Sequence, residues 1–164
     1  MTLNRLELPF RKNCEGYFFD GNGNVLAKKM NGFLVFPGGG VDDNEDVKDA
    51  IIRETLEETG AVIVNLKKIG NLKFVWGVDW AKTEKQKKRY INFQGEDMTF
   101  FTGKIDEFVN VKNSNEDSWN GEKLIKISDA VKFIESESFD EHNKKYREFQ
   151  LSSLKNLLTG DKND

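Results

Sequence analysis

The hydrophobic and polar positions along this chain predict short strands that lead into a glycine-rich segment. Aromatic and β-branched residues dominate positions 14–19, and the turn-forming sequence at 20–24 favours a hairpin whose second strand covers 25–30. A further apolar run at 33–36 leads into three consecutive glycines at 38–40. We therefore expect a sheet that holds the glycine segment.

A helix is predicted directly after the glycines. Asp43 or Asn44 can cap its amino terminus, and Gly60 suits the left-handed position at which many helices end. With about 100° between successive residues, one face carries small or apolar side chains: Val47, Ala50, Ile51 and Thr55. Ile52 and Leu56 lie on the opposite face, so we expect other layers to cover this helix on two sides.

Strands are predicted again after Gly60. Three segments alternate between apolar and polar positions or are rich in β-branched and aromatic residues: 62–66, 72–76 and 98–105. A last short strand is expected at 122–127. Residues 80–89, which include Lys82 and Arg89, are rich in basic side chains, and we expect a solvated excursion between strands there. A basic loop beside a polyphosphate site would also attract an anionic substrate.

Two helices are predicted at the end of the chain. The first is capped by Ser128 or Asp129 and runs to Ile134, and the second covers 140–158. The second helix has a covering apolar stripe: Tyr146, Phe149, Leu151, Leu154 and Leu158. The tail at 159–164 is expected to fray.

Composition and charge fit one globular domain over residues 1–164. Charged residues make up 32% and hydrophobic residues 37%, with 13 Phe, which indicates an aromatic-rich interior. The net charge of -3 argues against a broad nucleic-acid-binding surface. Cys14 is the single cysteine, so no internal disulfide can form, which favours a reducing cytoplasm. No apolar run approaches the ~20 residues of a transmembrane helix, and the amino terminus lacks a signal-peptide core.

Three glutamates of the predicted helix form an unusual cluster. Glu54 and Glu58 point out of the face that carries the apolar stripe, and Glu57 lies about 60° from Glu54. A solvated charged face would interleave lysines, but the cation within this turn is Arg53. Carboxylates gathered without matching counter-charge are expected to be paired or to bind a metal. Oxygen ligands of this kind suit Mg²⁺ or Mn²⁺, whereas zinc prefers nitrogen and sulfur.

Gly38, Gly39 and Gly40 are placed to complete such a site. Glycines before a helix allow positive φ and a close approach of the backbone to a ligand, so that a carbonyl can join the carboxylates at a metal. The alternative is a flexible turn without a ligand. The fixed offset between the glycines and the glutamates favours the ligand-binding interpretation.

The segment 36–61 resembles the Nudix box of the Nudix hydrolase family. Gly39 is followed after five residues by Glu45, and after seven more by the sequence Arg-Glu-Thr-Leu-Glu-Glu-Thr-Gly-Ala at 53–61. The usual Phe-Pro-Gly lead-in precedes this segment. Every charged and glycine position of the pattern is filled at the right spacing.

The resemblance implies a role for each matching residue. Three correspond to the metal-binding, catalytically required glutamates of the family: Glu54, Glu57 and Glu58. The carbonyl of Gly38 matches a backbone metal ligand, and Arg53 with Glu45 matches an ion pair that joins loop and helix. Thr55 stands where a bulky aliphatic residue is usual, and Ala61 is small for the closing hydrophobic position. These two departures concern the packing of the helix more than its chemistry.

The resemblance also implies a fold and a reaction. The family's fold is an α/β/α sandwich with a mixed sheet, in which the box forms a loop, a helix and a loop. Its reaction is the hydrolysis of a diphosphate linkage in a nucleoside diphosphate joined to another group X, with Mg²⁺ or Mn²⁺ as the cofactor. The predicted catalytic set is therefore Arg53 together with Glu54, Glu57 and Glu58.

Substrate contacts are predicted on both sides of the box. In the resembled family a basic residue in the strand before the box often touches a substrate phosphate, which makes Lys28 or Lys29 a candidate. Alternation directs only one of the two inward, and a solvated edge lysine is the alternative. Gly39 and Gly40 are further candidates. Four aromatic residues are candidates for stacking on a base, with core packing as the alternative: Trp76, Trp80, Tyr90 and Phe93.

An acidic residue that activates water is predicted outside the box. In relatives of this pattern it often comes from the loop before the last strand, which makes Glu116 or Asp117 the first candidate and Glu96 the second. Surface charge is the alternative for each. The single histidine, His142, is expected to be an ordinary helix residue.

Several functions remain open at this stage. The leading hypothesis is a pyrophosphohydrolase that acts on nucleoside triphosphates, normal or oxidised, and the second is one that acts on nucleotide sugars, ADP-ribose or dinucleoside polyphosphates. From another class, a non-catalytic nucleotide-sensing protein or a purely structural acidic helix would also fit. We expect a small-molecule nucleotide as the partner, no stable nucleic-acid partner, no membrane, and a monomer or homodimer in the cytoplasm.

Overall fold

The structure is a computed structural model that describes residues 4–111, 119, 121–137 and 141–161. Its main sheet contains six strands: β1 (Phe10–Phe19), β2 (Asn24–Leu26), β5 (Gly38–Gly40), β6 (Ala61–Val75), β7 (Gly95–Phe108) and β8 (Leu124–Lys126). A separate ribbon pairs β3 (Lys28–Met30) with β4 (Phe33–Val35). The helices are the short 3-10 helix η1 (Arg5–Glu7), α1 (Val47–Thr59), α2 (Glu84–Asn92), α3 (Ile127–Ser136) and α4 (Glu141–Asp161).

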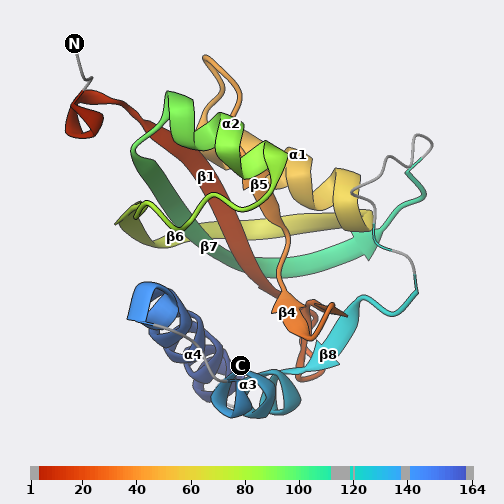
Figure 1. Ribbon diagram of the computed structural model, residues 1–164. Helices are drawn as coiled ribbons and strands as arrows, with labels where there is room; N and C mark the ends of the chain where they lie inside the picture. Colours follow the sequence, from red (N-terminus) through yellow and green to blue (C-terminus); the bar gives the residue numbers. More distant parts are fainter. Residues whose placement is uncertain (1–3, 112–118, 120, 138–140, 162–164) are drawn as a thin grey trace.

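Helices lie on both sides of the main sheet (Figure 1). α1 and α2 are on one side, and α3 and α4 are on the other. The strand order is β6-β7-β1-β2-β8, and β5 also pairs with β1. β1 runs parallel to β7 and antiparallel to β2 and β5. A mixed sheet between two helical layers confirms the predicted α/β/α sandwich. No helix in the described ranges is long and apolar enough to cross a bilayer.

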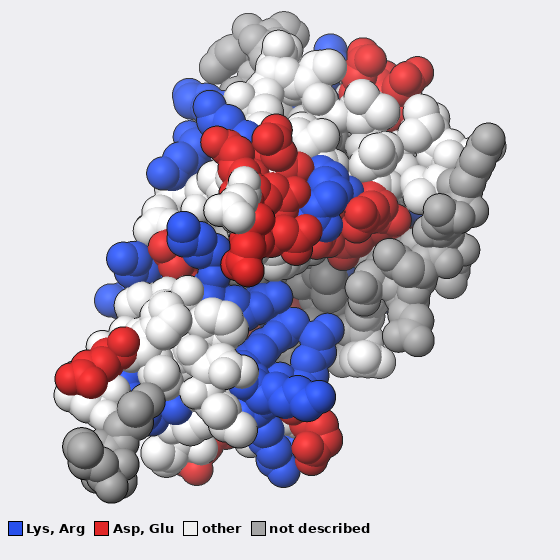
Figure 2. Space-filling view, turned by 90° about the horizontal axis from the view of Figure 1, so that it is seen from above, with Lys and Arg blue, Asp and Glu red and all other residues white. Residues whose placement is uncertain are grey.

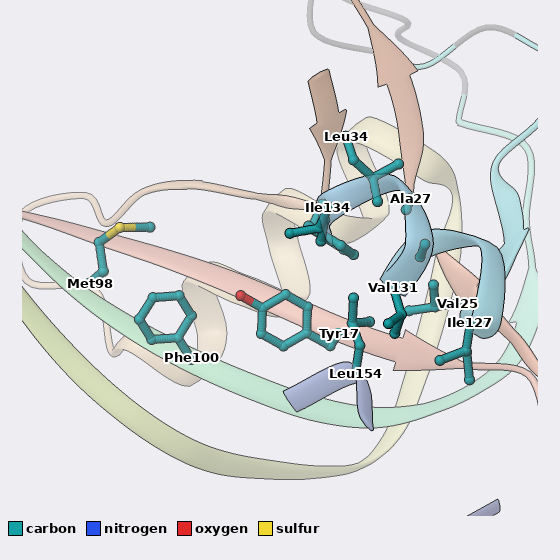
Figure 3. Packing of buried hydrophobic residues seen from close by; sticks show 12 residues of the cluster. Tyr17, Val25, Ala27, Leu34, Met98, Phe100, Ile127, Val131, Ile134 and Leu154 are labelled. Atoms are coloured by element: carbon teal, nitrogen blue, oxygen red, sulfur yellow. The ribbon is translucent and has the colours of Figure 1, made fainter. Parts of the chain in front are cut away.

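An aromatic cluster fills the space between the sheet and α3 and α4. The ring of Tyr17 lies edge-on to Phe36, with centroids 4.9 Å apart, and parallel to Phe100, with centroids 6.2 Å apart. Figure 3 shows Tyr17 with Ile134 and Leu154, and all three side chains are fully buried. The aromatic-rich interior predicted from composition is therefore concentrated on this side of the sheet.

The opposite side of the sheet is covered by α1. Ala50, Ile51 and Thr55 are fully buried, as their shared face predicted. Ile52 and Leu56 are 37% and 36% exposed, so the prediction that layers cover α1 on two sides is wrong. A pair of apolar residues on one helix face does not require burial, because much of any protein surface is apolar.

α1 begins later than its sequence predicted. The cap is Asp46, whose carboxylate accepts the N–H of Lys48 at 2.8 Å, in place of Asp43 or Asn44. Asn44 has a positive φ of 64°, a conformation that continues a turn rather than a helix. At the other end Gly60 has the predicted left-handed conformation, with φ of 79°.

β6 is one long strand where the sequence predicted two, at 62–66 and 72–76. It pairs with β7 from Ala61 to Val75, but three register shifts break the alternation of its side chains. Conversely, the segment 25–30 predicted as one strand is divided between β2 and β3, which belong to different sheets. In the sequence, a break in the alternation of apolar and polar residues is indistinguishable from the end of a strand.

The segment 80–89, predicted as a solvated excursion, contains most of α2. Thr83 caps this helix through a capping box, in which its hydroxyl accepts the N–H of Gln86 at 3.1 Å and the Gln86 side chain accepts the N–H of Thr83 at 3.1 Å. Lys85, Lys87 and Lys88 therefore extend from a helix and not from a loop, whereas Lys82 precedes it.

The last two helices also differ from their predicted ends. α3 starts at Ile127 directly after β8, without a side-chain cap, so Ser128 and Asp129 lie inside its first turn. α4 continues through Thr159 to Asp161, where a frayed tail was expected. Residues 162–164 lie outside the described part of the chain.

Candidate functional site

Arg53 joins the two halves of the Nudix-like segment. Its Nε and Nη2 donate to the two carboxylate oxygens of Glu45 at 2.9 and 3.0 Å. Nη2 also donates to the carbonyl of Gly40 at 3.2 Å. Nη1 donates to Glu54 at 3.0 Å and to Glu57 at 3.4 Å. One guanidinium therefore ties the glycine strand, the acidic turn and the helix together.

The electrostatics of this pair follow from its geometry. The hydrogen bonds from Arg53 hold the pKa of Glu45 at about 2, and the N–H of Asp42, which donates to Glu45 Oε1 at 3.0 Å, acts in the same direction. In return, the hydrogen bond to Glu45 raises the pKa of Arg53 above its usual value. The ion pair expected from the family resemblance is present, as a two-bond contact of the strong bidentate kind.

Gly38 and Gly39 lie too close to β1 and to α1, respectively, for any side chain. A Cβ on Gly39 would lie 2.7 Å from the carboxylate carbon of Glu54, and one on Gly38 would lie 2.1 Å from the carbonyl oxygen of Cys14. The N–H of Gly38 donates to Glu58 Oε1 at 2.9 Å. Glycine is therefore required here by close neighbours within the protein, whereas the predicted approach of a ligand stays a prediction.

The positive φ predicted for the glycines is wrong. Gly38, Gly39 and Gly40 form β5, a regular partner of β1, and positive φ occurs at other glycines of the described chain. A flexible turn is likewise excluded. The segment is a strand because its backbone forms hydrogen bonds with β1. This long-range pairing cannot be read from the local sequence.

The donor set at this place suits a hard divalent cation. Glu54, Glu57 and Glu58 supply carboxylate oxygens from one helix, and the side chains of Glu54 and Glu57 are 19% and 44% exposed. Burial raises the pKa of the nearby Cys14 thiol to about 12, so this residue does not supply a thiolate ligand.

Figure 2 shows a band of acidic side chains with a basic group at its centre.

The carboxylates are not gathered as a finished metal cage. Within the described ranges there is no group of three or more His, Cys, Asp or Glu side chains that could hold a metal ion as they stand. Glu54 and Glu57 are drawn to Arg53, and Glu58 is drawn to the N–H of Gly38. The chemistry of the donors fits Mg²⁺ or Mn²⁺.

Val109 and Trp119, on the two sides of positions 112–118, form hydrogen bonds to the carboxyl end of α1. Glu116 and Asp117, the first candidates for a water-activating base, lie outside the described residues. On one flank the N–H of Val109 donates to the carbonyl of Gly60 at 2.8 Å, and on the other the N–H of Trp119 donates to the carbonyl of Glu58 at 2.7 Å. Val109 and Trp119 are therefore both fixed at the carboxyl end of α1.

Glu96, the second candidate base, lies on β7 in a separate cluster. It forms an ion pair with Arg11 at 3.6 Å and accepts a long hydrogen bond from Asn13 at 3.5 Å. Burial raises its pKa. Arg11 in turn lies against Gly40. Arg11 therefore lies between Glu96 and the Nudix-like segment.

Lys28 and Lys29 line a groove of about 630 Å³ with residues of β8 and α3. The Nζ of Lys29 lies 5.0 Å from the ring centre of Phe133, so this lysine is turned toward α3. The predicted contact of either lysine with a substrate phosphate is not tested by these positions.

The aromatic candidates for base stacking contact other groups. Trp76 is buried and stacks on Trp80, with ring centroids 3.7 Å apart and nearly parallel planes. The guanidinium of Arg5 lies 3.3 Å from the ring centre of Tyr90 and donates to the carbonyls of Tyr90 and Phe93. Trp76 is thus buried, whereas Trp80, Tyr90 and Phe93 are half-buried, and the contacts of Arg5 join the amino-terminal turn to α2 and its end.

Comparison with known proteins decides the family. The family model described as NUDIX domain matches residues 12–150, most of the chain. This chain belongs to the Nudix family. A curated Nudix relative, the uncharacterised Nudix hydrolase YvcI of Bacillus subtilis, is 41% identical over 51 residues, which is 31% of this chain and 32% of YvcI. The match thus covers about a third of that relative's length.

Solved structures support the same Nudix fold. A Nudix hydrolase from Nitrosomonas europaea superposes with a TM-score of 0.54 at 12% identity, over 87% of this chain and 90% of that one. A structure from work on MutT of Aliivibrio salmonicida and Vibrio cholerae gives a TM-score of 0.52 at 20% identity, over 87% and 96% of the two chains. At such identities the likeness concerns the fold alone.

Reading the sequence missed Arg11 altogether. The predicted first strand began at Cys14, whereas β1 begins at Phe10 and pairs residue by residue with β7. Arg11 is the direct partner of Glu96 in that ladder. A charged residue just before an apolar run carries no local signal, and its partner lies 85 positions later in the chain.

Proposed function

We propose that this Nudix protein is a divalent-metal-dependent hydrolase that cleaves a diphosphate linkage in a nucleoside diphosphate joined to a group X. The contacts of Arg53 carry this proposal, because they join Glu45, Gly40, Glu54 and Glu57 in one hydrogen-bonded unit. A structural acidic helix would not need a half-buried arginine to hold two of its carboxylates beside a glycine strand.

The proposed cofactor is Mg²⁺, with Mn²⁺ as a substitute. Its proposed ligands are the carboxylates of Glu54, Glu57 and Glu58 and the carbonyl of Gly38. A bound divalent cation supplies charge neutralisation at phosphate oxygens and makes water more acidic. The geometry that supports this assignment is the closeness of Glu54 to Gly39 and of Glu58 to the N–H of Gly38.

The chain's own residues prepare the site in advance. Arg53 holds Glu54 and Glu57 beside the carbonyl of Gly40, and both carboxylates would turn from Arg53 to bind a cation. Glu58 fixes the distance between α1 and β5 through Gly38. For the base that orients and deprotonates water we propose Glu116 or Asp117 first and Glu96 second, on the family resemblance alone.

Nucleoside triphosphates, normal or oxidised, are the first substrate class we propose. Nucleotide sugars, ADP-ribose and dinucleoside polyphosphates form the second class. The basic residues of α2, on the same side of the sheet as α1, support an anion-rich substrate. Figure 2 shows a further region of lysine and arginine side chains on the face that carries the acidic band.

The test is a hydrolysis panel with the purified protein. Each compound class is incubated with Mg²⁺, with Mn²⁺ and with excess EDTA, and the products are separated by chromatography. We expect cleavage at a diphosphate linkage for one class, with loss of activity in EDTA. Tight nucleotide binding without hydrolysis of any compound would instead support a nucleotide-sensing protein and overturn the proposed activity.

A further inference from the structure

Glu15 of β1 places a carboxyl group inside the aromatic cluster that α4 covers, with only 7% of the residue exposed. Tyr17 donates to its Oε2 at 2.6 Å, Gln150 of α4 donates to the same oxygen at 3.1 Å, and the hydroxyl of Tyr146 donates to Oε1. Arg147 donates to the amide oxygen of Gln150 at 2.6 Å, which directs the amide nitrogen toward Glu15. We call these residues other than Arg147 the Glu15 network. It connects α4 to β1 by polar contacts in addition to apolar packing.

The backbone of Glu15 is the ladder partner of Gly38, whose carbonyl is a proposed metal ligand. The two strands leave no space for a side chain between them, since a Cβ on Gly38 would lie 2.9 Å from the Cα of Glu15. Next to this pair, the N–H of Gly16 donates to the carbonyl of Pro37 at 3.0 Å. A displacement of β1 at Glu15 would therefore displace Gly38.

Neighbouring residues of β1 point to opposite sides of the sheet. Cys14 packs in the cluster that includes residues of α1, and its Sγ donates to the carbonyl of Gly39 at 3.4 Å. Glu15 points to the other side, where α4 lies (Figure 1). The Glu15 network can therefore affect the proposed metal ligands through the position of the backbone, and not by direct contact.

A buried carboxyl group is not needed merely to keep α4 on the sheet. A polar or charged group loses its hydration when it is buried, and well-packed apolar side chains of similar size often stabilise a protein as well or better. A hydrogen-bond network instead fixes one relative position, because each donor has to meet its acceptor within narrow limits of distance and angle. The Glu15 network therefore sets the position of β1 relative to α4 more strictly than apolar packing alone would.

We propose that the Glu15 network positions Gly38 for binding of the divalent cation, with Glu15, Tyr146 and Gln150 as positioning residues. This inference rests on the proposed function, because it takes the carbonyl of Gly38 as a metal ligand. The N–H of Gly38 also donates to Glu58 Oε1 at 2.9 Å, so a shift of Gly38 would move a contact of a second proposed ligand. Loss of the network should weaken metal binding at the opposite side of the sheet.

A role of the network in the docking of α4 alone predicts a different behaviour. Loss of the network would then lower the free energy of unfolding and leave metal binding by the folded protein unchanged. Leu154 of α4 offers a matched control, because its apolar side chain is fully buried in the same core cluster as Tyr17. Leu154→Val loosens the packing of α4 and leaves the donors and acceptors of the Glu15 network in place.

The experiment compares wild type, Tyr146→Phe, Glu15→Leu and Leu154→Val. Electron paramagnetic resonance of free Mn²⁺ gives the Kd of the metal in the absence of substrate, and urea unfolding gives the stability of each protein. For Tyr146→Phe we expect the Kd of Mn²⁺ to rise about 3- to 10-fold, a usual size for coupling through intervening residues. Glu15→Leu removes the acceptor of the whole network and should raise this Kd further. Leu154→Val should be less stable than wild type with an unchanged Kd.

Enzyme kinetics provides a second measurement of the same change. The Mg²⁺ concentration that gives half of the maximal rate should rise in Tyr146→Phe in parallel with the Kd of Mn²⁺. In saturating Mg²⁺, kcat should stay within about twofold of wild type, because the change removes binding of the metal and not a contact made only in the transition state.

The outcomes separate this inference from the proposed function. An unchanged Kd of Mn²⁺ in Tyr146→Phe and Glu15→Leu, or an equal rise in Leu154→Val, would overturn the positioning role while hydrolysis by wild type stands. If Glu15→Leu does not fold, Tyr146→Phe decides alone. If wild type binds Mn²⁺ but hydrolyses no nucleotide, the proposed activity fails, and a higher Kd in Tyr146→Phe still supports the positioning role. Absence of Mn²⁺ binding by wild type would overturn the metal ligands and this inference together.

Discussion

Thr55 carries a buried hydroxyl that makes no hydrogen bond to the described residues. It lies on the inner face of α1 with no exposed surface, and its Oγ1 is buried without a partner. Thr59, one turn later, is equally buried, but its hydroxyl donates to the carbonyl of Thr55 at 2.7 Å and accepts the N–H of Ala61 at 3.1 Å. The resemblance had marked position 55 as unusual, and the structure supplies the physical reason.

We expect Thr55→Val to stabilise the protein. Valine has nearly the same shape, so the substitution removes the desolvation cost of the hydroxyl without opening a cavity. The free energy of unfolding should rise by about 1 kcal/mol, the size of the penalty for an unsatisfied buried hydroxyl. Urea unfolding followed by circular dichroism measures the change.

Thr59→Val is the matched control for this prediction. Its hydroxyl serves two partners, so the same change of chemistry should lower the free energy of unfolding by about 1–2 kcal/mol. Destabilisation by Thr55→Val as large as that by Thr59→Val would mean that Thr55 has a partner after all.

Single residues were predictable where their partners are close in sequence. The contact of Arg53 with Glu45 spans eight positions and is part of a recognisable spacing. Glu96 and Arg11 are 85 positions apart and meet only because β1 and β7 are parallel neighbours. Sequence reasoning therefore identified the proposed metal ligands but not the residues that surround them.

At the scale of the element, α1 works as a rigid support for three carboxylates. We expect Glu57→Gln and Glu58→Gln to lower kcat by about 100- to 1,000-fold, typical for loss of one electrostatic contact to a transition state. Both changes keep the shape of the side chain, so the folded structure should persist. Turnover in saturating Mg²⁺ and thermal unfolding together measure the two effects.

Glu84→Gln of α2 is the control for this element. Its side chain is 89% exposed and its partner is Lys87 on the same helix, so its kcat should equal that of wild type. Wild-type turnover in Glu57→Gln or in Glu58→Gln would show that the metal ligands have been assigned to the wrong carboxylates.

α2 shows why a helix can be missed. Its lysines and arginine made segment 80–89 look like a solvated loop, yet the sequence Thr83-Glu84-Lys85-Gln86 already contained a capping-box pattern. The basic composition of segment 80–89 favoured a loop, whereas the capping box at Thr83 favoured a helix. The start of α1, by contrast, depends on the turn at Asn44 and could not be fixed to a residue by pattern alone.

The cap of α2 provides a prediction of its own. Thr83→Ala should free the first turn and cost about 1 kcal/mol locally, which corresponds to about fivefold faster hydrogen exchange at the amides of Gln86 and Lys87. Thr83→Ser keeps the hydroxyl and should exchange like wild type. Unchanged exchange in Thr83→Ala would mean that tertiary contacts, not the cap, hold this turn.

At the scale of the whole molecule, a buried carboxyl group connects α4 to the central strand. Glu15 of β1 is the ladder partner of Gly38 and accepts hydrogen bonds from Tyr17 at 2.6 Å, from Gln150 at 3.1 Å and from Tyr146. The partners on α4 lie more than 130 positions away in the sequence. No pattern predicted this network, since it exists only when the helix has docked.

Glu45 gives the fold an acid-sensitive contribution. Its pKa in the folded state is about 2, below the usual value of 4.5, because Arg53 donates to it. The stabilisation is therefore present above pH ~4.5 and is lost as pH falls toward ~2. We expect Glu45→Gln to be less stable than wild type at pH 6 and the difference to shrink as pH falls from ~4.5 toward ~2, measured by urea unfolding at each pH. A constant difference across that range would contradict the assignment.

Glu15 should act with the opposite sign. Burial raises its pKa above 4.5 despite the hydrogen bonds from Tyr146, Tyr17 and Gln150, so the folded state holds its proton more tightly than the unfolded chain does. The resulting stabilisation is complete below pH ~4.5 and is lost as pH rises through the raised pKa.

Glu96 contributes in the same direction as Glu15, because burial also raises its pKa. We therefore expect the free energy of unfolding of wild type to decline with rising pH above ~4.5, and Glu15→Gln to decline less steeply. Glu96→Gln, measured in parallel, gives the contribution of Glu96 to the pH dependence of the free energy of unfolding. If Glu15→Gln follows the wild-type slope while Glu96→Gln flattens it, the docking of α4 does not depend on the protonation of Glu15.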